Sequence, residues 1–196
     1  MATLYYQGHS SFRITANDGT VMYIDPFAGN GYELPADIIL VTHAHHDHNH
    51  IELPAKKPDC RVITNKDALE GGRHNSFTER GFEIESVEAK NLMHNPKKCV
   101  GYIIMVDGVR IYAAGDTSQT KQMESFAQRH LDYAMFPLDG IANMSLKQAT
   151  RCAALMGAKH NIPVHLKPGK LFDRARAEKW TVPNRLIIAP GEEIVL

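Results

Sequence analysis

Short apolar segments separated by turn residues fill the first part of the chain. Residues 4–8, 10–15 and 20–26 are rich in β-branched and aromatic side chains and are divided by Gly, Asn and Asp, a pattern typical of strands. The sequence Asn-Asp-Gly at 17–19 indicates a hairpin turn between the second and third segments. An unbroken apolar run over 38–41 then predicts a strand that is buried on both faces.

The remainder of the chain alternates between strand and helix patterns. Further strands are predicted over residues 61–64, 82–90, 100–116 with a turn at Asp107-Gly108, 133–138 and 161–165, and a closing hairpin is predicted over 185–196 around Pro190-Gly191. Helices are predicted over 66–70 after a cap at Asn65, over 119–130 after a cap at Thr117 or Ser118, and over 146–156 between a capping box Ser145–Gln148 and Gly157. This alternation predicts one α/β domain over residues 1–196, with a sheet core and outer helices.

Composition narrows the class of protein. Lys and Arg total 22 and Asp and Glu total 22, and this balance argues against a nucleic-acid partner, which would favour a basic excess. The 43% of hydrophobic residues is enough for a packed core. The start of the chain lacks a signal-peptide pattern and no apolar run reaches the roughly 20 residues that span a bilayer, so we expect a cytoplasmic protein without a membrane partner. Three scattered cysteines, Cys60, Cys99 and Cys152, indicate reduced thiols.

Residues 42–50, THAHHDHNH, concentrate five histidines and an aspartate directly after the apolar run. In an extended chain, side chains two positions apart point the same way, so His43 and His45 can reach one point. Asp47 and His48 are adjacent and diverge, so they can serve a second point. Imidazole and carboxylate are the usual ligands of zinc and similar ions, and the spacing favours two ions close together over a polar solvent loop. His46 and His50 fall outside this pattern and are expected in solvent or in supporting roles.

Two ions need more ligands than four side chains provide. His94, Asp116 and His165 are the candidates, because Asp116 and His165 follow apolar strands and His94 precedes a predicted strand pair. The other histidines, His74, His130 and His160, lie in polar loops or at a helix end and are expected on the surface.

Six segments in this order resemble the metallo-β-lactamase superfamily over nearly the whole chain: GHSSF at 8–12, YIDPF at 23–27, THAHHDH at 42–48, His94, AAGDT at 113–117 and PVH at 163–165. The GHSS and DPF segments are similar to those of the L-ascorbate-6-phosphate lactonase-like proteins and of many metal-dependent hydrolases. The resemblance implies a four-layer αβ/βα sandwich with a dinuclear site at one edge. By motif position it implies one metal held by His43, His45 and His94, a second held by Asp47, His48 and His165, and Asp116 bridging both.

Two adjacent divalent ions lower the pKa of a shared water, so a bridging hydroxide is available near neutral pH to attack a carbonyl or phosphoryl centre. Asp47 or Asp116 would orient it and move a proton to the leaving group. We therefore predict a hydrolase of an ester-like bond (lactone, carboxylic ester or phosphodiester) in a small-molecule substrate. Zinc is the expected ion, and manganese, iron and nickel remain open because no cysteine joins the set.

Five further residues are candidates for substrate contact or for support of the ligands. His9 would contact a ligand or support the site, with a structural role as the alternative. Asp25 ends a strand and would orient a ligand histidine, with a plain turn beside Pro26 as the alternative. Asp139 and Asn143 lie in a loop that the resemblance places over the active site, with a plain helix-entry loop as the alternative, and Lys167 would meet an anionic group or lie on the surface.

Other functions compete with the hydrolase. A di-iron redox or oxygen-handling protein would use the same ligands, but the chain shows no second domain for a flavin. A nuclease is disfavoured by the neutral charge, and a non-catalytic metal protein by the complete ligand set. The segment over 27–35 is either a mobile flap or a connecting loop, and the oligomeric state is not predicted.

Overall fold

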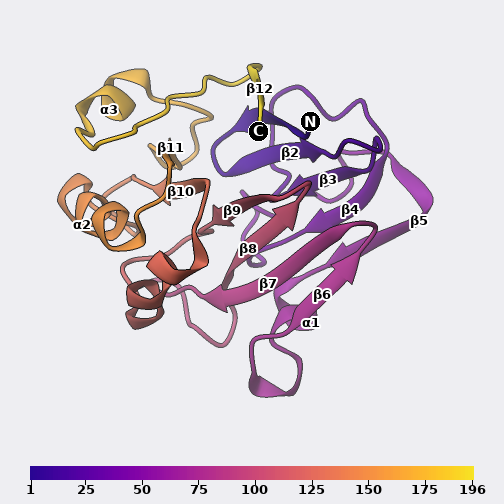
Figure 1. Cartoon of the computed structure of the whole chain (residues 1–196), viewed down its shortest axis with the longest axis horizontal. Coiled ribbons are helices and arrows are strands. Elements are labelled where there is room, and N and C mark those ends of the chain that lie inside the picture. Colours follow the sequence, from indigo (N-terminus) through magenta and orange to yellow (C-terminus); the bar gives the residue numbers. More distant parts are fainter.

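Two six-stranded sheets pack against each other in the computed structural model, which describes all residues 1–196 (Figure 1). The first sheet has the order β12 (Glu193–Val195), β1 (Thr3–Gly8), β2 (Ser11–Thr15), β3 (Val21–Ile24), β4 (Ala36–Leu40) and β5 (Lys56–Ile63). The second has the order β11 (His160–Val164), β10 (Tyr133–Pro137), β9 (Val109–Ala113), β8 (Val100–Val106), β7 (Phe82–Glu88) and β6 (Ser76–Glu79). The chain therefore builds one sheet with its first third, adds the second, and returns to the first with its last strand.

The direction of pairing determines which strand ends share an edge. β3, β4 and β5 are parallel to one another, and so are β9, β10 and β11. The carboxyl ends of parallel strands meet at the same edge of a sheet, where sites collect in α/β folds. Each sheet thus offers one edge at which loops from distant parts of the sequence come together.

The principal core lies between the two sheets. Ile38 and Leu40 of β4 point into this core of 25 buried residues, whereas Ile39 and Val41 belong to a small cluster on the outer face of the first sheet. The apolar run is therefore buried on both faces, as its pattern predicted. A third cluster of 19 buried residues joins the second sheet to its helices.

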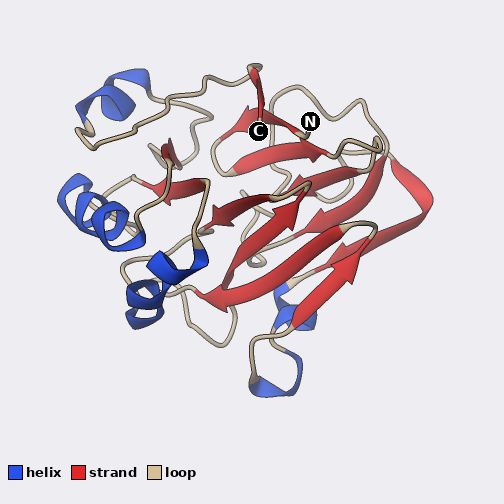
Figure 2. Ribbon diagram, viewed as in Figure 1, coloured by secondary structure: helices blue, strands red, loops and turns tan.

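Five short helical elements complete the fold: α1 (Asn65–Ala68), η1 (Glu70–Gly72), η2 (Lys121–Arg129), α2 (Leu146–Met156) and α3 (Arg174–Lys179). Figure 2 shows η2, α2 and α3 together on one side of the molecule, with α1 apart from them. They cover the second sheet through residues such as Phe126 and Trp180. The predicted fold class is confirmed: two mixed sheets with outer helices. On the outer face of the first sheet, loop residues including Tyr32 and Ile51 supply the cover.

Local details differ from the prediction where tertiary pairing dominates. Helix α1 is capped by Thr64 and not by Asn65, because the Thr64 hydroxyl accepts from the Lys66 amide. The segment predicted as a helix over 119–130 is a 3₁₀ helix that begins after Thr120, and neither Thr117 nor Ser118 caps it. The prediction of a closing hairpin around 190–191 is wrong, because β12 pairs with β1 at the far edge of the first sheet.

One strand begins earlier than predicted, and two elements form where no pattern indicated them. β5 begins at Lys56, five residues earlier than predicted, and the edge strand β6 and helix α3 were missed. By contrast, α2 follows its predicted bounds, with the Ser145 side chain accepting from the Gln148 amide and Gly157 in the left-handed conformation at its end.

The segment over 27–35 is tied down at several points. The Gly31 carbonyl accepts from the side chains of Gln7 and Arg13 at 3.2 and 3.1 Å, and the Tyr23 hydroxyl donates to the Leu34 carbonyl at 2.8 Å. These contacts support the connecting-loop interpretation over a mobile flap. No helix of the structure is both long and apolar enough to cross a bilayer.

Candidate metal centre

All seven predicted metal ligands lie in loops around the facing edges of the two sheets. The segment over 42–48 follows β4, Asp116 follows β9 and His165 follows β11, so six of the seven predicted ligands come from the first sheet's edge loop or from loops after the second sheet's parallel strands. His94 comes from the loop between β7 and β8. The order of the strands in the two sheets therefore brings these residues together although they are far apart in the sequence.

His43, His45 and His94 form one cluster, here called the imidazole group. The Nε2 atom of His94 lies 3.2 Å from Nε2 of His43 and 3.0 Å from Nδ1 of His45. One nitrogen from each ring therefore faces a common point, and all three lie within 4.8 Å of one another. This is the ligand number and type that a single divalent ion accepts from protein histidines.

Asp47, His48 and His165 form a second cluster, here called the carboxylate group. Their ligand atoms also lie within 4.8 Å of one another, and His9 reaches the same region. Oδ2 of Asp47 is 3.9 Å from Nε2 of His165. The two groups adjoin, because the ring centroids of His43 and His48 are 4.2 Å apart.

Asp116 lies between the two groups. Its Oδ1 atom is 3.3 Å from Nε2 of His48 and 3.4 Å from Nε2 of His165, while its Oδ2 atom is 3.4 Å from Nε2 of His94. One carboxylate oxygen therefore faces each group. A carboxylate so placed can contribute one ligand atom to each of two ions.

The ring nitrogens that face away from the centre contact protein oxygens. Nδ1 of His48 is 2.8 Å from Oδ2 of Asp25, and Nδ1 of His165 is 3.0 Å from Oδ2 of Asp139. Nδ1 of His94 is 2.7 Å from the Asn91 side-chain oxygen. Such partners fix the ring orientation and leave the opposite nitrogen as the ligand.

Asp25 reaches both groups. Besides contacting His48, its Oδ2 accepts from the Thr42 hydroxyl at 2.7 Å, and that hydroxyl lies 3.0 Å from Nδ1 of His43. Its Oδ1 accepts from the Thr42 amide at 2.7 Å. One buried carboxylate thus orients a histidine of each group. The orienting role of Asp25 stays a prediction, and its contacts add Thr42, which the sequence pattern did not single out.

Three of the seven non-glycine residues with positive φ lie at this site. They are His9 (φ 59°), Asp25 (φ 46°) and His165 (φ 44°). Left-handed backbone costs free energy for residues with a side chain, and it persists where the surroundings hold it. The turns after β1, β3 and β11 are therefore bent so that these three side chains face the centre.

Burial sets the protonation of the imidazole group. Desolvation, with the nearby charge of His48, lowers the pKa of His43 to about 2, and desolvation also lowers the pKa of His94. Both rings are thus neutral near pH 7, the form that binds a metal. Burial would raise the pKa of the Asp116 carboxyl, but the nearby charge of His48 outweighs it, so that pKa lies well below its usual value.

Unsatisfied buried atoms test whether a metal fits. Nε2 of His48, Nε2 of His165 and Oδ1 of Asp116 are buried and have no hydrogen-bond partner, and the Asp116 oxygen lies 3.3 and 3.4 Å from the two nitrogens. Buried polar atoms are rarely left unpaired, because the loss of hydration costs free energy. A cation among them would satisfy all three, so the residues fit a metal ion at this point.

Two of the residues predicted to support the ligands, His9 and Asn143, contact the centre or the partners of its histidines. His9 is buried, with Nδ1 donating to the Lys170 carbonyl at 3.0 Å and Nε2 lying 3.2 Å from Oδ2 of Asp47, so it orients Asp47. The Asn143 side chain donates to Asp139 at 2.8 Å and accepts from Asn91 at 2.8 Å, which links the partners of His165 and His94.

The remaining candidates lie outside the centre. Lys167 is exposed and forms no contact with these side chains. His46 is exposed, and His74 and His130 also lie at the surface, as expected. His160 stacks on Tyr133 at 4.9 Å between ring centroids and belongs to the far end of β11. Asn91 was missed by the pattern, although its position three residues before His94 is a signal that could have identified it.

The chain is similar to known proteins in both sequence and fold. The chain is 29% identical to the UPF0173 metal-dependent hydrolase of Pyrococcus furiosus and 30% identical to that of Thermococcus onnurineus, with 100% of both chains covered in each case. Among solved structures, Igni18, a metallo hydrolase of Ignicoccus hospitalis, superposes with a TM-score of 0.75 at 21% identity, covering 98% of this chain and 97% of that one. CmlA, a diiron β-hydroxylase of Streptomyces venezuelae, shares the fold with a TM-score of 0.72 at 12% identity, covering 100% of this chain and 54% of that one.

The model of the beta-lactamase superfamily domain matches residues 3–165, which include all seven predicted ligands from His43 to His165. With two facing sheets, clustered imidazoles at their edges and a shared carboxylate, this chain belongs to the beta-lactamase superfamily.

Proposed function

We propose that this protein is a metal-dependent hydrolase that cleaves an ester-like bond (a lactone, carboxylic ester or phosphodiester) in a small molecule. The observation that carries the proposal is Asp116, whose two oxygens face two separate sets of imidazoles. Relatives that match the whole chain bear the name metal-dependent hydrolase, which supports the same reaction class.

The residues of the centre would hold two divalent ions, zinc being the first candidate. His43, His45 and His94 would hold one, Asp47, His48 and His165 the other, and Asp116 would contribute to both. When bound, such ions make hydroxide available near neutral pH and offer positive charge to a developing oxyanion. This chemistry requires only that the substrate's carbonyl or phosphoryl group reach the centre.

Asp47 has the geometry to move a proton. Its side chain is 19% exposed, in contrast to the buried His48 and His165 of the same group, and His9 lies 3.2 Å from its Oδ2. Burial would raise the pKa of this carboxyl, but the hydrogen bond with His9 and the charge of His48 lower it below its usual value. An ionised, partly exposed carboxylate can orient the attacking water and pass a proton towards the leaving group.

A narrower relationship to the L-ascorbate-6-phosphate lactonase-like proteins is part of the proposal. It rests on the GHSS and DPF segments, and both contribute to the centre, through His9 and Asp25 respectively. We further propose that residues 1–196 act as one domain in the cytoplasm.

Elemental analysis of protein purified without added metal or chelator tests the centre. We expect about two ions per chain in the wild type and about one fewer in His94→Ala, with no change in the control His130→Ala, whose ring is exposed and distant. An unchanged metal content in His94→Ala would remove His94 from the ligand set.

Activity is then measured on lactone, carboxylic ester and phosphodiester substrates after reconstitution with zinc, manganese, iron or nickel. We expect hydrolysis that a chelator abolishes and that His45→Ala reduces by at least about a hundredfold. Full activity in His45→Ala contradicts the proposal, and iron-specific oxygen consumption without hydrolysis would favour the di-iron redox alternative.

A further inference from the structure

A cavity of about 750 Å³ opens beside the imidazole group. His43, His45 and His94 form one wall, so a molecule in the cavity would contact the centre directly. Its volume suits a small-molecule ligand. The other walls come from α1 and from the loop after His94.

The charged side chains around this cavity all have the same sign. Lys66, Lys97 and Lys98 line it, and no aspartate or glutamate does. The chain as a whole is neutral, with 22 basic and 22 acidic residues, so this local excess is not a general property of the surface. A concave surface lined with one sign of charge concentrates ligands of the opposite sign.

These lysines also lack acidic partners. Lys57, Lys90 and Lys159 each lie within 2.7 Å of a carboxylate oxygen, whereas Lys66, Lys97 and Lys98 form no ion pair. Their ammonium groups are therefore free to meet an external anion.

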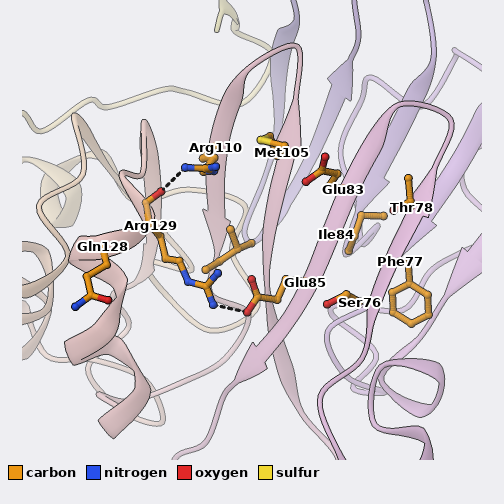
Figure 3. A pocket seen from close by; sticks show the side chains of 11 residues that line it. Ser76, Phe77, Thr78, Glu83, Ile84, Glu85, Met105, Arg110, Gln128 and Arg129 are labelled. Carbon is orange, nitrogen blue, oxygen red and sulfur yellow. Dashed lines mark hydrogen bonds and ion pairs between the residues drawn. The ribbon is translucent and has the colours of Figure 1, made fainter.

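A second concave region of the surface serves as a comparison for the charge of this cavity. A groove of about 360 Å³ lies on the second sheet, away from the centre, and Figure 3 shows both signs of charge along it. The guanidinium of Arg129 pairs with Glu85 at 2.6 Å, and Arg110 donates to the Arg129 carbonyl at 2.9 Å. That groove holds charges of both signs and an internal ion pair, whereas the cavity beside the centre holds lysines alone.

The backbone that carries the lysines is held in place. The buried Asn65 side chain donates to the Lys98 carbonyl at 2.9 Å and so joins α1 to the loop after His94. The amides of Lys97 and Lys98 both donate to Asn95, at 2.9 and 2.8 Å, which closes a tight turn. The three lysines thus come from two connected segments that line the cavity.

We propose that the substrate carries an anionic group, a carboxylate or a phosphate, away from the bond to be cleaved, and that Lys66, Lys97 and Lys98 bind it. The inference rests on the proposed hydrolase function for the bond that is broken. Leu69 and Met93, the apolar side chains of the same cavity, would contact the part of the substrate between its anionic group and its reacting carbonyl or phosphoryl group.

The first experiment measures anion binding, not activity. The metal-loaded protein is titrated calorimetrically with inorganic phosphate and with succinate, and a variant with Lys66, Lys97 and Lys98 each changed to Gln is compared with one carrying Lys121, Lys147 and Lys179 changed to Gln. Both variants lose three exposed lysines, so net charge is matched. We expect affinity to fall about tenfold or more in the first variant only, and to recover when the three positions carry Arg.

The outcomes separate the sources of binding. Equal affinity in both variants means that the anion binds the metal ions alone, and this overturns the inference. A loss for phosphate but not succinate identifies a phosphate, and the reverse identifies a carboxylate. Metal content is measured on every variant, because unchanged content shows that the lysines act on the anion and not on the centre.

A kinetic comparison links the cavity to the reaction. 4-Nitrophenyl acetate and mono-4-nitrophenyl succinate have the same leaving group and differ in a distal carboxylate. We expect the cavity variant to lower kcat/KM for the succinate ester about tenfold relative to the acetate ester. An unchanged ratio overturns the inference while leaving the hydrolase function intact. Selective anion binding without any hydrolysis contradicts the hydrolase function alone.

Discussion

The imidazole group and the carboxylate group of the candidate metal centre differ in the side chains that form and support them. The imidazole group contains no carboxylate, and its rings are oriented by uncharged oxygens of Thr42 and Asn91. The carboxylate group contains Asp47, and aspartates contact its histidines from behind. A carboxylate behind a ligand histidine raises the basicity of the ring and strengthens metal binding. We therefore expect the carboxylate group to bind its ion more tightly and the imidazole group to exchange its ion first.

Exposure differs in the same direction. His48 is fully buried, whereas His45 is exposed and the imidazole group opens onto the cavity with the three lysines. The more open half is thus the one that a substrate would reach. This contrast suggests a division of work, in which one half anchors an ion and the other half meets the ligand.

The largest effect is expected from Asp116→Ala, which removes the contact between the halves. Each group would lose one ligand, so we expect the metal content to fall from about two ions per chain to less than one and hydrolysis to disappear. Elemental analysis measures this, with the exposed Asp18→Ala as the control. If Asp116→Ala kept both ions, the two groups would be independent sites.

The variants Asp25→Asn and Asp139→Asn remove the charge of the carboxylates that contact the predicted ligand histidines. Asp25 contacts His48 directly and His43 through Thr42, so its loss should weaken both ions about 10- to 100-fold. Among the predicted ligands Asp139 contacts only His165, so its loss should weaken only the tighter ion.

Competition with a chromophoric chelator measures the two affinities in each variant. If Asp25→Asn and Asp139→Asn changed the two metal affinities in the same way, the contact of Asp25 with His43 through Thr42 would have no effect on metal binding.

Asn91→Ala tests the uncharged support and should have the smallest effect. It removes one neutral hydrogen bond behind His94, and we expect the weaker ion to lose affinity only a few-fold, with the tighter ion unchanged. The same chelator competition measures it. A loss as large as that of Asp25→Asn would show that neutral partners orient these rings as effectively as carboxylates.

The candidate site was predictable to a large extent because its signals are local. The spacing of His43, His45, Asp47 and His48 depends on the two-residue period of an extended chain, and the preceding apolar run identifies a buried strand. Asp116 and His165 were found for the same reason, since each follows an apolar strand. Structure brings all of them within one centre, although their roles as ligands stay a prediction.

Secondary structure was less predictable where distant pairing decides it. β12 forms only because β1 offers its free edge, with Leu4 opposite Ile194, and nothing near residue 190 encodes that partner. Thr64 replaces Asn65 as the cap of α1 because β5 ends at Ile63, one residue before its predicted end, so the helix begins one residue earlier. Such shifts of one residue lie within the range in which several caps are locally acceptable.

The sequence by itself determined the chemical types in the centre and the strand ends that carry them, because periodicity and ligand spacing act over a few residues. The tertiary structure alone decided which partner lies behind each ring. Asp25 meets His48 across 23 positions and Asn65 meets the Lys98 carbonyl across 33. Only the parallel order of the strands, which aligns their carboxyl ends at one edge, and the packing of loops upon them could bring such residues together.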